Sequence, residues 1–243
     1  MISRTGIGWG GLLALLLTAA CRGAERPAQR GERADTTGPP AASAPASPAS
    51  AGAHVFVPTI VFLGTSLTAG YGLDPEEAYP AVIQRKLDSL GLRYRVVNAG
   101  VSGESSAGAL NRIGWILRQP PAILVIETGA NDGLRGQDLD QLRANLQGIV
   151  DSTRRRAPGA RIVLAGMEAL PNLGAEYTRR FRSIYREVAA ANHLPLIPFL
   201  LAGVGGVDSL NQEDGIHPNA AGARVVAENV WRVLRPLLEG GGG

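Results

Sequence analysis

Ser66 lies in a glycine-rich segment, residues 64–72, that directly follows the first apolar run of the predicted domain. Such a segment can be a plain turn from a strand into a helix, a phosphate-binding loop, or a tight turn that presents a nucleophilic serine. The glycine spacing of dinucleotide-binding loops and the Gly-Lys-Ser/Thr of Walker-type loops are both absent. Taken alone, the segment does not choose among the three interpretations.

Asp214 and His217 lie three residues apart in the segment Asp-Gly-Ile-His-Pro, near the carboxyl end of the chain. An aspartate at this spacing can reach the imidazole ring and fix its tautomer, which a histidine needs in order to act as a base. The plain alternative is the start of a helix in which the two residues have no joint role. The pair is a candidate acid–base unit.

Two further residues could bind a negative charge that develops during a reaction. Gly103 follows the second apolar run and could offer its backbone N–H to an oxyanion, where a side chain would obstruct close approach. Asn131 belongs to an Asn-Asp-Gly sequence that is common in turns, yet its amide is also a hydrogen-bond donor. In isolation, each residue fits an ordinary loop or turn.

Short apolar runs alternate with longer amphipathic stretches from residue 55 onward. The runs are β-branched or aliphatic and bounded by turn residues, which predicts strands at residues 55–63, 94–98, 122–127, 161–166 and 194–198. The stretches between them predict helices at residues 79–90, 105–117, 139–157, 175–191 and 219–238. This alternation predicts an α/β fold whose parallel sheet carries helices on both faces.

The chain has three histidines, and the predicted topology separates them. In an open parallel sheet, ligands bind outside the carboxyl ends of the strands. His54 lies before the first strand, and His193 immediately precedes the fifth, which places it at the opposite edge of the sheet. His217 alone follows a strand. The segments with the candidate serine, glycine and asparagine also follow strands, so four candidate segments are expected to meet at one edge.

Four blocks of the sequence, in this order, resemble the blocks of the SGNH (GDSL-type) hydrolase family. They are Gly-Thr-Ser-Leu at residues 64–67, Gly103, Gly-Ala-Asn-Asp at residues 129–132 and Asp-Gly-Ile-His-Pro at residues 214–218. Each block is a weak signal, but four in order are a strong one. The similarity runs through residues 58–238 and is closest to the bacterial thioesterase I, arylesterase and lysophospholipase branch.

The resemblance implies a role for each candidate. Ser66 is expected to attack an acyl carbonyl, His217 to take its proton and return it to the leaving group, and Asp214 to orient the imidazole. The oxyanion is expected to bind the backbone N–H groups of Ser66 and Gly103 and the side chain of Asn131. The family further implies a three-layer α/β/α, flavodoxin-like fold with a five-stranded parallel sheet, and no metal or organic cofactor.

Thr65 departs from the family pattern, which usually has aspartate before the serine. That aspartate is a neighbour of the nucleophile and is not part of the triad. The resemblance therefore predicts altered local hydrogen bonding at residue 65 rather than loss of activity.

The loop after the fourth predicted strand is expected to border the site. Met167 and Leu170 in this loop suit an acyl chain, although apolar residues there fit ordinary loop packing equally well. The leading hypothesis is an esterase or thioesterase that acts on acyl esters, including lysophospholipids. A carbohydrate O-deacetylase of the same fold would favour a polar, aromatic-lined cleft. A non-catalytic, tethered binding lipoprotein would not need to keep an intact triad.

The first 53 residues are predicted to lie outside the hydrolase domain, which spans residues 54–243. Residues 1–20 combine Arg4, an apolar run and small residues, as a secretory signal peptide does. Cys21 follows directly, and Leu-Thr-Ala-Ala-Cys resembles a bacterial lipoprotein processing box, which implies lipidation of Cys21, although Thr18 replaces the usual leucine. Residues 21–53, which are rich in Ala, Pro and Ser, are predicted to form a disordered linker.

The net charge of +3 comes mainly from the amino-terminal part of the chain. Five of the 24 basic residues, but only three of the 21 acidic ones, precede His54, so the predicted domain is close to neutral. It shows no basic patch with interleaved aromatic residues, which argues against nucleic acid as a partner. We expect an exported protein of the periplasm or cell envelope that meets the membrane through Cys21 and acts on a small acyl ester or lipid.

Overall fold

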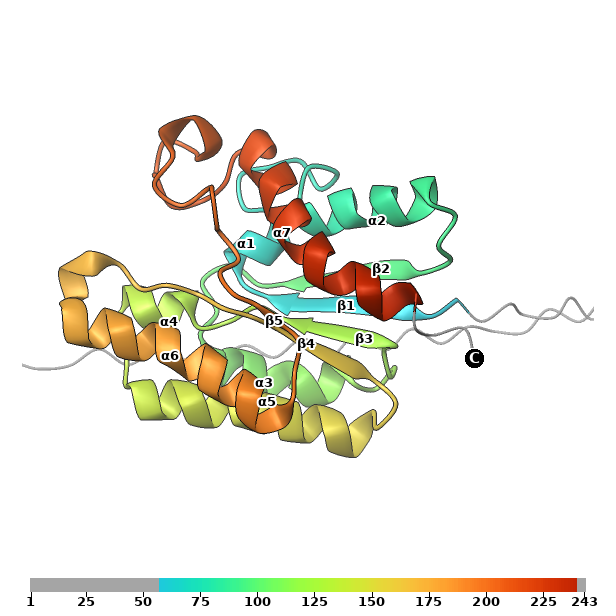
Figure 1. The fold of residues 1–243 in the computed structure, drawn as a ribbon, viewed down its shortest axis with the longest axis horizontal. Coiled ribbons are helices and arrows are strands. Elements are labelled where there is room, and N and C mark those ends of the chain that lie inside the picture. The colour runs from blue at the N-terminus through green and yellow to red at the C-terminus, as the bar shows by residue number, and fades with distance from the viewer. Residues whose placement is uncertain (1–56, 240–243) are drawn as a thin grey trace, which may run out of the picture. The chain divides into compact units, whose positions relative to one another are not determined.

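A computed structural model describes residues 57–239 of the protein (Figure 1). The predicted signal peptide, the predicted lipidation site Cys21, the predicted linker and His54 lie outside the described residues, as do residues 240–243.

Five parallel strands form a sheet with the order β2-β1-β3-β4-β5. All four side chains of β3 are buried, and its sequence Ile-Leu-Val-Ile is apolar throughout because both of its faces are covered. The strands are β1 (Thr59–Gly64), β2 (Arg95–Gly100), β3 (Ile123–Ile126), β4 (Arg161–Ala165) and β5 (Leu196–Ile197). This strand order is the flavodoxin-like one.

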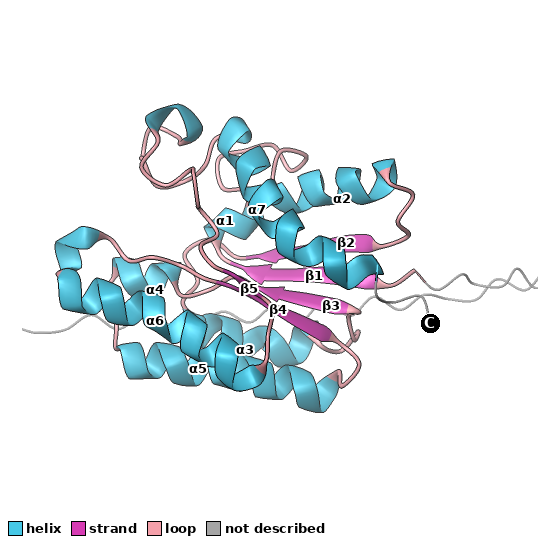
Figure 2. Ribbon diagram, viewed as in Figure 1, coloured by secondary structure: helices cyan, strands magenta, loops and turns pink. Residues whose placement is uncertain are grey.

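Helices cover both faces of the sheet and make a three-layer fold (Figures 1 and 2). On one face α2 (Tyr79–Ser89) packs against α7 (Ala220–Glu239). On the other face α5 (Leu139–Arg156) lies between α3 (Ser106–Ile116) and α6 (Ala175–Asn192). The buried residues of these helices recur at intervals of three and four, the spacing of one helix face. The predicted three-layer α/β/α fold with a five-stranded parallel sheet is confirmed. Among the helices at residues 57–239, none is long and apolar enough to cross a membrane.

The short elements differ from the sequence-based expectation. β1 begins at Thr59, because the preceding Pro58 has no N–H to donate to a neighbouring strand. β5 has only two residues, which pair with Leu164 and Ala165 of β4. Four short helices lie where loops were expected: α1 (Ser66–Ala69), α4 (Ala130–Leu134), η1 (Pro171–Leu173) and η2 (Asp208–Leu210).

Because all five strands are parallel, their carboxyl ends lie at one edge of the sheet. α1 directly follows β1, and α4 follows β3 after a short turn. The segment after β2 leads into α3, and the long segment after β5 leads through η2 into α7. The four candidate segments therefore come from the same edge.

Candidate active site

Ser66 is the first residue of α1, on a tight turn that begins where β1 ends. Gly64, the last residue of β1, has no room for a side chain, since a Cβ there would lie 1.9 Å from Thr68 Oγ1 and 2.7 Å from Glu127 Oε2. Because α1 begins at Ser66, the backbone N–H of this residue has no acceptor within the helix. The turn therefore presents a hydroxyl group and a backbone donor at the sheet edge.

His217 lies between Ser66 and Asp214. Its Nε2 atom is 2.9 Å from Ser66 Oγ, and its Nδ1 atom is 2.6 Å from Asp214 Oδ2. When Nδ1 carries the proton and donates it to the carboxylate, Nε2 has a lone pair that can accept the serine hydroxyl proton. The three side chains can thus transfer a proton from Ser66 to the imidazole while the carboxylate holds the ring.

The carboxylate of Asp214 also fixes the loop that carries the histidine. Its Oδ1 atom accepts hydrogen bonds from the backbone N–H groups of His217, at 3.0 Å, and Ile216, at 2.9 Å. The backbone and side-chain hydrogen bonds from His217, together with the bond from Ile216, lower the pKa of Asp214 to about 2. Asp214 is therefore ionised at neutral and mildly acidic pH, as an acceptor for the imidazole requires.

Gln212 and Tyr71, which the sequence analysis did not single out, hold the loop that carries His217 against the segment that follows Ser66. Gln212 Nε2 donates to the carbonyl oxygens of Tyr71, at 2.7 Å, and Pro218, at 3.0 Å, while its backbone N–H donates to the carbonyl of His217 at 2.8 Å. The rings of Tyr71 and His217 are 4.7 Å apart between centroids. Tyr71 and Gln212 are 141 positions apart, so no local pattern signals this contact.

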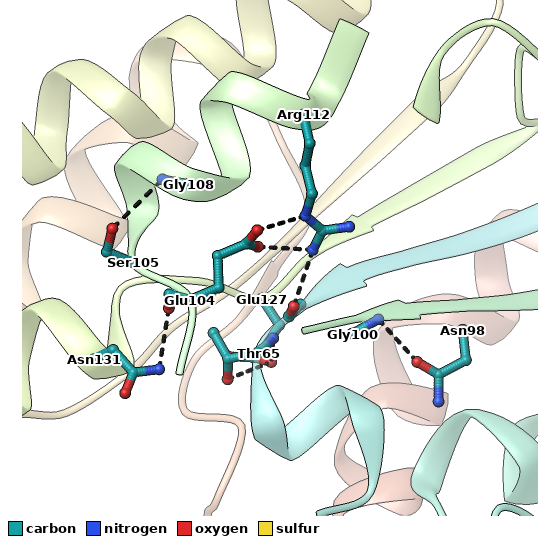
Figure 3. Close-up of polar contacts among 10 residues, drawn as sticks. Thr65, Asn98, Gly100, Glu104, Ser105, Gly108, Arg112, Glu127 and Asn131 are labelled. Atoms are coloured by element: carbon teal, nitrogen blue, oxygen red, sulfur yellow. Dashed lines mark hydrogen bonds and ion pairs between the residues drawn. The ribbon is translucent and has the colours of Figure 1, made fainter. Parts of the chain in front are cut away.

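The expected oxyanion donors line the same cleft as Ser66 and His217. Gly103 has a φ of +78°, a left-handed backbone conformation that favours glycine. Asn131, on α4, donates one amide hydrogen to the carbonyl oxygen of Glu104 at 3.0 Å (Figure 3). The amide group has a second hydrogen that can be donated to a ligand.

The residue after Asn131 anchors α4 to the start of α3. Asp132 is buried and accepts hydrogen bonds from the backbone N–H of Ser106, at 2.8 Å, and from its hydroxyl, at 2.5 Å. Asn145 of α5 donates to the same hydroxyl at 2.9 Å. These bonds join three helices and set the direction in which the neighbouring Asn131 side chain leaves α4.

Thr65, the residue before Ser66, donates hydrogen bonds to the buried carboxylate of Glu127 (Figure 3). Its backbone N–H donates to Glu127 Oε2 at 2.7 Å, and its hydroxyl donates to Oε1 at 2.9 Å. Thr68 donates to Oε2 at 2.8 Å and also contacts the hydroxyl of Tyr79 at 2.7 Å. Burial raises the pKa of Glu127 despite these bonds. An aspartate at residue 65 would face this carboxyl group and would need a shared proton, whereas threonine supplies donors.

The cleft beside Ser66 has a volume of about 490 Å³. Met167 and Leu170 both line it: Met167 is 3% exposed and forms part of its floor, whereas Leu170 is 44% exposed. Phe199, Leu201 and Ile216 add further apolar surface. The cleft wall is therefore mainly apolar, and its polar groups include Ser66, Asn131, His217 and Glu168.

His193 lies away from this cleft. It directly follows α6, with a left-handed φ of 53°, and β5 begins three residues later. It therefore lies at the amino-terminal end of a strand, as the topology predicts. His193 is not among the described residues that line the cleft.

Residues 62–225 match the model of the GDSL-like lipase/acylhydrolase family, which is more than half of the chain. The chain belongs to this family. It is 44% identical over 181 residues to Esterase TesA of Pseudomonas aeruginosa, covering 74% of this chain and 89% of that protein. It is 34% identical over 181 residues to thioesterase 1/protease 1/lysophospholipase L1 of Escherichia coli K12, covering 74% and 85%. A crystal structure of TesA superimposes with a TM-score of 0.71 at 43% identity and covers 74% of this chain and 99% of that one.

These comparisons confirm the predicted resemblance to GDSL-type hydrolases and to their esterase and thioesterase branch. The matched range, residues 62–225, contains Ser66, Gly103, Asn131, Asp214 and His217. Membership in this family is consistent with a carboxylic ester hydrolase. The individual roles of the site residues rest on the geometry described above and are part of the following proposal.

Proposed function

We propose that the protein is a serine esterase or thioesterase that hydrolyses acyl esters, with Ser66 as nucleophile, His217 as general base and acid, and Asp214 as the group that orients the imidazole. The observation that carries the proposal is the continuous hydrogen-bonded chain from Ser66 Oγ through His217 to Asp214, at the mouth of an apolar cleft. Serine hydrolases on unrelated folds share this arrangement of side chains.

In the proposed reaction, Ser66 Oγ adds to the substrate carbonyl carbon while His217 Nε2 accepts the hydroxyl proton. The carbonyl oxygen becomes an oxyanion, which receives hydrogen bonds from the backbone N–H groups of Ser66 and Gly103 and from the Asn131 amide. Loss of one such donor typically costs about 3–4 kcal/mol of transition-state stabilisation. His217 then protonates the departing alcohol or thiol, and water, deprotonated by the same imidazole, hydrolyses the acyl-serine.

The cleft supports an acyl chain rather than a sugar as the group next to the scissile bond. Met167 and Leu170 are proposed to contact that chain, with Phe199 and Ile216 on the same wall. A carbohydrate O-deacetylase would favour a polar, aromatic-lined cleft, and the surface of this cleft is mainly apolar. A non-catalytic binding lipoprotein would not require the Ser66–His217–Asp214 geometry. Similarity to proteins named arylesterase, thioesterase and lysophospholipase supports arylesters, acyl thioesters and lysophospholipids as substrate classes.

We also propose that the protein is exported to the periplasm or cell envelope and held at a membrane by acylation of Cys21. The support comes from the sequence alone: residues 1–20 have the layout of a signal peptide, and Cys21 follows its small residues. Two or three acyl chains on Cys21 would give stable anchoring, since each buried methylene contributes about 0.8 kcal/mol.

A panel of substrates tests the proposed activity. We expect hydrolysis of p-nitrophenyl esters, with activity extending to medium acyl chains, and little release of acetate from acetylated sugars. Ser66→Ala should reduce turnover to less than about 1% of wild type, because the residual rate comes only from binding and the oxyanion donors. Its thermal unfolding should remain close to that of wild type. A folded Ser66→Ala protein that retains a substantial part of the esterase activity would refute the proposal.

A further inference from the structure

A two-pronged ion pair joins Glu104, the residue after Gly103, to Arg112 on α3 (Figure 3). Arg112 Nε lies 2.6 Å from Glu104 Oε1, and Arg112 Nη2 lies 2.7 Å from Oε2. The side chains of Glu104 and Arg112 are 10% and 21% exposed. A fork of this kind is rigid and directional, because the planar guanidinium and the carboxylate share two parallel hydrogen bonds. Neither residue lines the cleft, and the proposed mechanism uses neither.

Arg112 also reaches the nucleophile turn. Its Nη2 atom donates to the carbonyl oxygen of Gly64 at 3.1 Å, two residues before Ser66. The same carbonyl accepts the backbone N–H of Val101 at 2.9 Å, from the segment that leads to Gly103. Arg112 therefore connects the end of β1 to the loop after β2.

Glu104 connects Arg112 to Asn131. Its backbone carbonyl accepts the amide hydrogen of Asn131 at 3.0 Å, while its carboxylate holds Arg112. Through these two residues, the three expected oxyanion donors (the N–H of Ser66, the N–H of Gly103 and the amide of Asn131) are fixed to one rigid ion pair. An exposed arginine, Arg135, also donates to the Gly103 carbonyl at 3.0 Å, but exposed contacts of this kind hold a loop weakly.

A glycine inside α3 leaves room for this arrangement. A Cβ at Gly108 would lie 2.7 Å from Glu104 Cγ. A glycine inside a helix makes the helix less stable than an alanine would, because glycine loses more backbone freedom when the chain folds. Its presence one turn before Arg112 is explained by the space that the Glu104 side chain occupies.

We propose that the Glu104–Arg112 pair consists of two positioning residues that set the distances among the oxyanion donors. This inference rests on the proposed function. The pair does not touch the substrate. Its effect is to hold the Gly103 loop, the Asn131 amide and the nucleophile turn in the geometry that the tetrahedral oxyanion requires, so its loss is felt in the transition state more than in substrate binding.

If the Glu104–Arg112 pair acted only through its charges, Glu104→Gln would change the rate in a different direction from the one that the positioning proposal predicts. Glu104→Gln removes a negative charge and leaves the positive charge of Arg112 without a partner near the oxyanion. A purely electrostatic role would then hold or raise the rate, because a positive charge stabilises an oxyanion. Under the positioning proposal the rate falls, since the amide of glutamine cannot accept both prongs of the guanidinium.

The test compares Glu104→Gln, Arg112→Gln and Arg112→Lys with two matched controls on ion pairs outside the cleft. Glu228→Gln removes the partner of Lys86, which lies 2.7 Å away, and Arg143→Gln removes the partner of Glu187. The readouts are kcat and KM for a short p-nitrophenyl ester, the inhibition constant of phenylboronic acid, and thermal unfolding. Phenylboronic acid forms a tetrahedral adduct with a serine hydroxyl and so reports on the oxyanion donors.

For Glu104→Gln and Arg112→Gln we expect kcat to fall by about tenfold or more, with KM within about threefold of wild type, because the lost contacts act on the transition state. The inhibition constant of phenylboronic acid should rise in parallel with the loss of kcat. Arg112→Lys should lie between these variants and wild type, since the ammonium group keeps the charge but lacks the planar fork that binds both carboxylate oxygens. The two controls should keep wild-type kcat and inhibition.

The outcomes separate this inference from the proposed function. If the wild type hydrolyses esters and Ser66→Ala does not, but folded Glu104→Gln or Arg112→Lys matches wild type in kcat and boronate inhibition, the positioning role is wrong and the esterase assignment stands. A Glu104→Gln variant with an increased kcat also overturns the positioning role. If the wild type hydrolyses no ester, both the proposed esterase function and the positioning role are wrong. Should Arg112→Gln fail to fold, Arg112→Lys and Glu104→Gln decide.

Discussion

The Nε2 atom of His217 lies 2.9 Å from the Oγ atom of Ser66, although 151 positions separate the two residues in the chain. Ser66 is placed by the end of β1, and His217 by the loop between η2 and α7. Gln212 ties this loop to the carbonyl of Tyr71, close to the nucleophile turn. The distance between the two reacting atoms is therefore set by the sheet edge and by the contacts that hold the loop of His217, among them those of Gln212 and Asp214.

His217→Ala should reduce esterase turnover about as strongly as Ser66→Ala, by a factor of 10³ or more, roughly the loss typical of a missing triad member. His193→Ala should leave turnover close to wild type, because His193 lies between α6 and the amino-terminal end of β5, at the opposite edge of the sheet. Steady-state kinetics on p-nitrophenyl butyrate provides the comparison.

The double variant Ser66→Ala/His217→Ala serves as a further check on this pair. Residues that act as one unit are not additive, so the double variant should be little slower than either single variant. A folded His193→Ala protein as inactive as His217→Ala would contradict the assignment of the histidines.

Glu127→Gln should change how stability depends on pH. Burial raises the pKa of Glu127, so the folded protein binds this proton more tightly than the unfolded chain does. The resulting contribution to stability is complete below the ordinary pKa of glutamate and is lost as the pH rises through the raised value. Each unit by which the pKa is raised corresponds to about 1.4 kcal/mol.

Urea unfolding at a series of pH values measures this effect. From mildly acidic to neutral pH, the free energy of unfolding of wild type should decrease relative to that of Glu127→Gln. Glu76→Gln, a substitution of the same kind at an exposed residue, serves as the control and should follow the wild-type curve. Parallel curves for wild type and Glu127→Gln would show that Glu127 titrates normally in the folded protein.

Leu170→Ala should shift the acyl-chain preference towards short esters. Leu170 lines the cleft but is partly exposed, so its truncation should lower kcat/KM for p-nitrophenyl octanoate by about threefold to tenfold, less than full burial of the lost carbons would give. The value for p-nitrophenyl acetate should stay within about twofold, because acetate does not reach this wall.

Leu90→Ala is a matched control for this substitution, since Leu90 is also exposed but follows α2, outside the cleft lining. Its chain-length profile should equal that of wild type. An equal loss for acetate and octanoate in Leu170→Ala would mean that Leu170 supports the site as a whole and does not contact the acyl chain.

Cys21→Ser tests the predicted membrane anchor. If Cys21 is acylated after signal removal, the wild-type protein should partition with membranes, and the variant should be released in soluble form or remain unprocessed. Specific activity towards a soluble short-chain ester should not change. Mass spectrometry of the mature amino terminus gives the answer directly: an unmodified terminus at or beyond Cys21, in a soluble protein, would disprove the lipoprotein prediction.

The fold could be predicted from the sequence because its long elements carry a clear periodicity. Buried strands such as Ile123–Ile126 are continuously apolar, and α5 repeats its buried residues at helical spacing. α1 and α4 could not be predicted in this way, because four or five residues make too few turns to show a period. The length of β5 depends on which residues of β4 are free to pair, which is a tertiary property.

The sequence predicted the residues proposed to react with the substrate, but it did not predict the residues that hold them in place. Ser66, Asp214 and His217 are recognisable because their types and spacing suggest chemistry. Glu127 was expected only as the last residue of a strand, since its partner Thr65 is 62 positions away. Glu104 in a loop and Arg112 in a helix are ordinary charged residues until the structure shows which segments they join.

Ester hydrolysis depends on the register of the parallel sheet, so activity shows whether the strands have aligned correctly during folding. β1 pairs with β2 so that Gly64 lies opposite Gly100, and with β3 so that Leu63 lies opposite Ile126. A slip of one residue between these strands would displace Ser66 from Gly103 or Asn131 by about 3.3 Å and reverse the faces of the strand. Helix content would hardly change in such a species. During refolding, the recovery of ester hydrolysis would therefore follow strand alignment, and could lag behind the recovery of the circular dichroism signal from the helices.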